Sequence, residues 1–127
     1  MLALGTIALG LIIHVGGSAL PVAPRDILGD VLWAMMVYWW LGVLAPASAY
    51  GARALMALAV CFAVETSQLL HTPALDAIRS TRVGHLFLGS GFDPRDFAAY
   101  TLGVLGAMLL ERSVRARRPS APRGAVT

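Results

Sequence analysis

The sequence contains little charge. Charged residues make up 13% of its 127 residues and hydrophobic residues 57%, and the mean hydropathy is +0.71. A soluble domain of this length needs more polar surface than this composition supplies. Lysine is absent, and half of the arginines lie at or beyond Arg112. This distribution is typical of a charged tail and not of a basic nucleic-acid-binding face, so we expect no nucleic-acid partner.

Cysteine is also scarce. Cys61 is the single cysteine and lies in an apolar run, so it has no partner for an internal disulfide. No CxxC or Cys/His spacing is present, and we therefore expect no metal site and no cofactor. We interpret Cys61 as a small buried hydrophobic residue.

Four long apolar segments dominate the chain. Each is near the ~20 residues that a helix needs to cross ~30 Å of hydrocarbon. The first two have no polar face at helical spacing, which argues against a soluble bundle. No basic residue precedes the first, so we expect a retained span and not a cleaved signal peptide. The sequence predicts an all-α integral membrane protein with four transmembrane helices: Met1–Leu20, Ile27–Ala45, Ala52–Leu70 and Asp96–Leu110.

The stretch HTPALDAIRSTRVGHLFLGSGFDPR separates the third and fourth segments. It is either a surface loop with a short interfacial helix or an interfacial or re-entrant segment packed over the bundle, and its apolar residues favour the second interpretation. In the fourth segment, Gly103, Gly106 and Ala107 predict close packing against a neighbouring helix. Residues 1–111 are predicted to form the membrane domain, and residues 112–127 an Arg-rich disordered cytoplasmic tail that starts as a frayed helix.

Arginine placement predicts the orientation. Four spans put both termini on one side, and the tail arginines follow directly after the last span, where the positive-inside rule is strongest. We therefore expect both termini in the cytoplasm and a multi-pass protein. Five of the seven acids then fall at or near the outer boundary: Asp26, Asp30, Asp76, Asp93 and Asp96.

Polar residues from three segments converge on the outer level. Glu65 lies about one and a half turns inside the third span, where an unpaired carboxylate is costly, so we expect it to face the bundle interior near Arg79 or Arg82. Gln68 follows it on the same helical face, as Tyr100 follows Asp96 on the fourth segment. The predicted outward-open, ligand-binding pocket consists of Asp30, Glu65, Gln68, Arg82 and Asp96, with His85 and Tyr100 at its margin.

These residues carry a family resemblance. The stretches GDVLWAMMVYW, VETSQLL and RSTRVGHLFLGSGFDPRDFAAYTLG resemble DUF2809, small bacterial membrane proteins of unknown function, from Ile27 to Leu110. In outline they are similar to the wider VanZ-like group, which has an acid opening one helix, E-x-x-Q on the next, and an acid entering the last, followed by glycine. The matching positions here are Asp30, Glu65, Gln68, Asp96 and Gly103.

Two positions depart from the VanZ-like pattern. Trp33 stands where that pattern has histidine, and Tyr100 stands where it tends to have asparagine. The resemblance implies the inner (cytoplasmic) membrane of a bacterium, with membrane lipids as partners. VanZ-like proteins are linked to glycopeptide resistance, whereas the DUF2809 family has no established activity.

Three classes of function stay open. In the first class, the pocket binds a polar lipid head group or an envelope precursor. In the second class, the protein is an accessory subunit of a larger membrane complex, and the charges of the pocket pin its helices together. In the third class the protein is an enzyme acting on a lipid-linked substrate, with Glu65 or Asp96 as general base beside His71 or His85. No spacing matches a known catalytic motif, so we lean against an enzyme.

Overall fold

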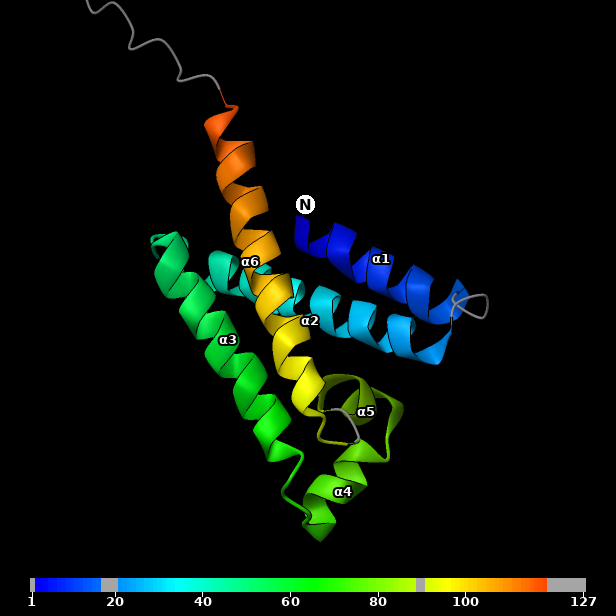
Figure 1. Ribbon diagram of the computed structural model, residues 1–127. Coiled ribbons are helices and arrows are strands. Elements are labelled where there is room, and N and C mark those ends of the chain that lie inside the picture. Colours follow the sequence, from blue (N-terminus) through cyan, green and yellow to red (C-terminus); the bar gives the residue numbers. More distant parts are fainter. Residues whose placement is uncertain (1, 17–20, 89–90, 119–127) are drawn as a thin grey trace, which may run out of the picture.

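The computed structural model describes residues 2–16, 21–88 and 91–118 (Figure 1). In these ranges the chain is helical without strands, which confirms the all-α prediction. The helices are α1 (Leu2–Gly16), α2 (Val22–Leu44), α3 (Tyr50–Ser67), α4 (Pro73–Arg79), α5 (Arg82–Leu88) and α6 (Pro94–Ala116).

The last helix is longer than its apolar segment. α6 begins two residues before the predicted Asp96 and ends six residues after Leu110. It thus continues past the predicted end of the membrane domain at residue 111. Residues 119–127 of the predicted tail, and residues 17–20 of the first predicted span, lie outside the described residues.

Local sequence fixes where α4 and α6 begin. The Thr72 hydroxyl accepts a hydrogen bond from the N–H of Leu75 (3.2 Å), and Asp93 Oδ1 accepts one from the N–H of Arg95 (2.9 Å). A proline follows each capping residue, at a position where its missing N–H leaves no helical hydrogen bond unmade.

Helices α2 and α6 run in the same general direction and cross each other (Figure 1). Val31 and Ala34 of α2 lie against Gly103, and further along both helices the Tyr38 hydroxyl donates to Glu111. Helix α3 runs antiparallel to both, because its start reaches the end of α6 and its end reaches the start of α6. Helix α1 packs along α2 (Figure 1). One end of this bundle therefore gathers the start of α2, the end of α3 and the start of α6.

Small residues allow the close contact between α2 and α6. A Cβ atom at Gly103 would overlap the carbonyl oxygen of Val31 and would lie 2.9 Å from the Cβ of Ala34. Ala107 is fully buried in the same interface. The prediction for Gly106 is wrong, because no atom lies within 4 Å of a Cβ placed there.

The outside of the bundle is apolar. Leu55, Leu102 and Val43 are each more than 60% exposed. Helices α2, from Pro24, and α6 are long and apolar enough to cross a membrane. Only 17% of the apolar window in α2 and 33% of that in α6 is buried, unlike the core helix of a soluble protein.

The segment between α3 and α6 contains two short helices. α4 and α5 lie at the end of the bundle where α3 ends and α6 begins (Figure 1). Their junction requires glycine at position 84, where a Cβ would overlap the carbonyl oxygen of Ile78. Gly84 thus serves the turn between α4 and α5.

Candidate functional site

Glu65 lies in the last turn of α3 and is completely buried. Its carboxylate accepts three hydrogen bonds: from Gln68 Nε2 (3.2 Å), from the Tyr100 hydroxyl (3.0 Å) and from the backbone N–H of Asp93 (2.8 Å). The prediction that Glu65 faces the bundle interior is confirmed. These bonds tie the end of α3 to the beginning of α6.

Helical periodicity explains why Glu65 points inward. The buried residues of α3 recur at spacings of three or four, from Arg53 through Ala57 and Cys61 to Glu65. The same spacing places Tyr100 on the buried face of α6, one turn beyond Asp96.

Asp30 and Asp96 approach each other from helices α2 and α6. Both are half-buried, and their carboxyl groups interact electrostatically with each other. Both acids also interact electrostatically with Glu65. We call Asp30, Glu65, Gln68, Asp96 and Tyr100 the carboxylate cluster.

Gln68 leaves one polar atom of the cluster unsatisfied. Its side chain is 7% exposed, and its Nε2 donates to Glu65. Its Oε1 is buried and has no hydrogen-bond donor among the described residues. The amide cannot be turned around without setting this oxygen against the Glu65 carboxylate. The cluster therefore has more acceptors than donors.

The structure does not bring the predicted basic residues into the cluster. Arg82 and His85 are exposed on α5. Arg79 is buried, but its guanidinium donates to the carbonyl oxygens of Ser67 and Leu70, each at 2.7 Å. The expected arginine partner of Glu65 is thus replaced by Gln68, Tyr100 and a backbone N–H. The guanidinium of Arg79 instead caps the C-terminal end of α3 and the turn that follows it.

The histidines are also separate from Glu65. His71 Nδ1 lies 3.5 Å from the Asp76 carboxylate in a largely exposed pair. Among the described residues, no group of three or more histidine, cysteine or acidic side chains is arranged to hold a metal ion.

Sequence comparison places these residues in a family. The family described as "Protein of unknown function (DUF2809)" matches residues 19–104. The chain belongs to the DUF2809 family. The match contains the whole carboxylate cluster and ends seven residues before Glu111. No solved structure matches the chain.

This DUF2809 protein has a second buried polar group, at the opposite end of the bundle. Arg53 Nη1 donates to both carboxylate oxygens of Glu111, at 3.0 and 2.8 Å, and Tyr38 donates to the same carboxylate at 2.8 Å. Arg53 also donates to the hydroxyl and carbonyl of Ser48, and Arg115 contacts Glu111 at 2.9 Å. We call this the Arg53 network. A Cβ at Gly42 would lie 3.0 Å from Arg53 Nη1, so this glycine makes room for the guanidinium.

Sequence reasoning missed the Arg53 network. Neither Arg53 nor Glu111 is among the residues of the predicted pocket. A signal was available in the steps of four residues that lead from Glu65 back through Cys61 and Ala57 to Arg53. Arg53 and Glu65 stand at the two ends of this row of residues. If the row faces the bundle interior, both charges need partners there.

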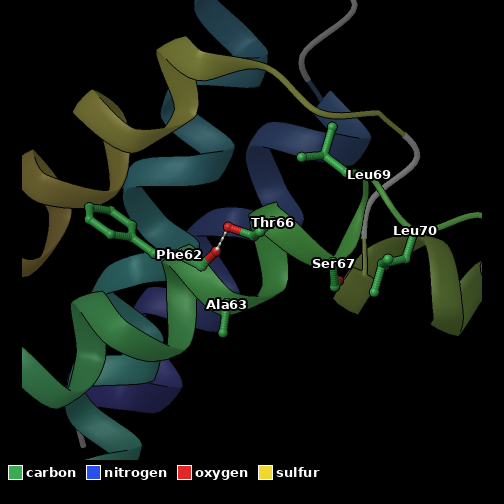
Figure 2. A pocket seen from close by; sticks show the side chains of 6 residues that line it. All are labelled: Phe62, Ala63, Thr66, Ser67, Leu69 and Leu70. Carbon is green, nitrogen blue, oxygen red and sulfur yellow. Dashed lines mark hydrogen bonds between the residues drawn. The ribbon is translucent and has the colours of Figure 1, made fainter.

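A surface hollow of this DUF2809 protein lies elsewhere. Figure 2 shows it along the outer side of α3, lined by Phe62, Ala63, Thr66, Ser67, Leu69 and Leu70. The Thr66 hydroxyl in it already donates to the Phe62 carbonyl (2.7 Å), and that of Ser67 donates to the Val64 carbonyl. Its lining is mostly apolar, so the carboxylate cluster is the stronger candidate for polar recognition.

Proposed function

We propose that this protein is a multi-pass membrane protein whose carboxylate cluster binds a polar head group of an envelope lipid or lipid-linked precursor. Helices α1, α2, α3 and α6 form the four spans in this proposal. The length and apolar surface of α2 and α6 support it, and α1 and α3 pack beside them.

The charge distribution supports an outward-facing cluster. Four exposed arginines follow one another from the last turns of α6: Arg112, Arg115, Arg117 and Arg118. The positive-inside rule places this end in the cytoplasm, and the carboxylate cluster at the opposite end then faces outward. This arrangement fits the inner membrane of a bacterium, with α4 and α5 at the outer surface.

One observation carries the binding proposal. Three acids from three helices meet at the outer end of the bundle, and the buried Gln68 Oε1 beside them lacks a donor. Buried polar groups in finished structural networks have hydrogen-bond partners. Intramembrane acids usually face a cavity or a functional pathway. An incomplete acidic cluster that a ligand completes accounts for both features.

The Arg53 network favours a structural role for the other end. There Glu111 is satisfied by Arg53 Nη1, which donates to both of its oxygens, by a tyrosine hydroxyl and by a second arginine. Such a network pins α2, α3 and α6 together. The accessory-subunit function therefore remains a second candidate, with the Arg53 network as the helix-pinning element.

Two cluster variants and one control test the binding proposal. Glu65→Gln and Asp96→Asn each remove a carboxylate with little change in shape, and Asp76→Asn changes an exposed acid on α4 at the same end. We expect all three variants to accumulate in the membrane, and only the first two to lose the envelope phenotype of the host. Loss of abundance in both cluster variants would assign the cluster a structural role. Full complementation by both would exclude the proposed site.

A further inference from the structure

We infer that the ligand group taken by the carboxylate cluster is cationic and is an organic ammonium ion. This inference rests on the proposed function and specifies the chemistry of the head group. It differs from the sequence-based expectation, in which arginines completed the pocket and favoured a polar or zwitterionic group bound through both signs of charge.

The cluster is acidic without a matching base. Asp30, Glu65 and Asp96 interact with one another, and Asp26 and Asp93 add negative charge at the same end. Among the described residues, the ion pairs of arginine and histidine involve Asp26, Asp76 and Glu111, and none involves the three cluster acids. Adding an anionic group to this site would increase the repulsion, whereas adding a cation would lower it.

The hydrogen-bonding groups of the cluster also indicate a positively charged ligand group. The side-chain donors of the cluster, Tyr100 Oη and Gln68 Nε2, both point at Glu65. The remaining groups are acceptors: the carboxyl oxygens of Asp30 and Asp96 and the unpaired Gln68 Oε1. An alkylammonium group carries up to three N–H donors and no acceptor, as a lysine side chain does. A phosphate or carboxylate brings further acceptors and would leave these oxygens unsatisfied.

The spacing of the acids favours an organic cation over a metal ion. A bound metal requires three or more ligands converging at 2.0–2.6 Å, and the described acids are not arranged in that way. An ammonium group instead binds carboxylates through hydrogen bonds of ~2.8 Å, which suits acids spread over three helices. Asp30 and Asp96 are half-buried, whereas Glu65 and Gln68 beside them are buried.

Thermal unfolding of the full-length purified protein tests the inference. The protein is reconstituted in a neutral phosphatidylcholine nanodisc and then with added phosphatidylethanolamine or phosphatidylglycerol, which differ in having or lacking a primary ammonium. We expect phosphatidylethanolamine to raise the unfolding temperature by roughly 3 °C or more and phosphatidylglycerol to leave it unchanged. Free ethanolamine and Mg²⁺ are tested separately, so that a lipid-borne amine, a soluble amine and a metal ion give different results.

Two kinds of variant sharpen the test. Asp30→Asn and Asp96→Asn should abolish the response, and Asp76→Asn should keep it. Gln68→Lys places an ammonium inside the cluster, so we expect a higher unfolding temperature without ligand and no further response to phosphatidylethanolamine. In a cluster that needs no cation, an added buried lysine would destabilise the protein instead.

The outcomes separate this inference from the proposed function. Equal stabilisation by both phospholipids would overturn the ammonium assignment and leave head-group binding intact. Stabilisation by Mg²⁺ alone, or a destabilised Gln68→Lys variant, would also overturn it. No response to any lipid or amine would overturn both.

Discussion

Arg53 at the start of α3 and Glu65 near its end are both buried, and both contact α6. Twelve residues of helix separate them by roughly 18 Å, with the fully buried Ala57 and Cys61 between them. One charge is satisfied by an opposite charge from α6, and the other lies among further acids. The bundle thus has a paired polar end and an unpaired acidic end, joined by a tightly packed apolar layer.

The paired end should dominate stability. Arg53→Ala leaves the buried Glu111 with the exposed Arg115 as its remaining ionic partner, and we expect a loss of about 3 kcal/mol or more. Arg112→Ala removes an exposed charge from the same end and should change stability by no more than about 0.5 kcal/mol. Unfolding in detergent with increasing dodecyl sulfate measures both. The Arg53→Met, Glu111→Leu double variant should recover part of the lost stability. Equal effects of Arg53→Ala and Arg112→Ala would rule out the Arg53 network as a stabilising element.

Two glycines in α6 make a matched pair. Gly103→Ala forces a methyl group against the Val31 carbonyl, so α2 and α6 must separate, and we expect a loss of about 1–3 kcal/mol. Gly106→Ala meets open space and should be neutral or stabilising by up to ~1 kcal/mol, because alanine favours the helix. Unfolding curves of both variants in the same detergent decide the matter. Similar losses at both positions would show that helix packing at Gly103 is not the cause.

Much of the architecture could be predicted because hydropathy and helical periodicity are local properties. The apolar segments located α2, α3 and α6, and counting turns along them placed Asp30, Glu65 and Asp96 at the same end. The structure brings these acids together with Gln68 and Tyr100. Whether they bind a ligand stays a prediction, as do four membrane spans and the likeness to VanZ-like proteins.

The predictions that failed concern partners across the bundle. Arg79 and Arg82 lie only three residues apart, yet one caps α3 and the other is exposed. That difference depends on the turn between α4 and α5, which no periodic pattern in the loop determines. The prediction for Gly106 fails for a similar reason. Gly103 and Gly106 both fit a packed helix, but the direction from which α2 approaches decides that only Gly103 is needed.

The cap that Arg79 provides should hold α4 against α3. Arg79→Ala removes the donors to the Ser67 and Leu70 carbonyls, at a cost of about 1–3 kcal/mol. Arg82→Ala removes an exposed arginine from the start of α5 and serves as the control. We expect faster amide hydrogen exchange across α4 in Arg79→Ala and unchanged exchange in Arg82→Ala. Unchanged exchange in both would mean that α4 is held without the Arg79 contacts.

Membrane topology tests the whole arrangement, because the functional proposal needs the two ends of the bundle on opposite sides. The exposed arginines at the end of α6 predict a cytoplasmic C-terminus, and the antiparallel path of α3 and α6 puts Thr81, between α4 and α5, at the other end. A phosphatase reporter inserted at Thr81 should be active outside the cell membrane, and the same reporter after Thr127 should be inactive. A fluorescent reporter that matures only in the cytoplasm should give the reverse pattern. If both positions report the same side, α6 does not cross the membrane, and a cluster open to the outer surface is excluded.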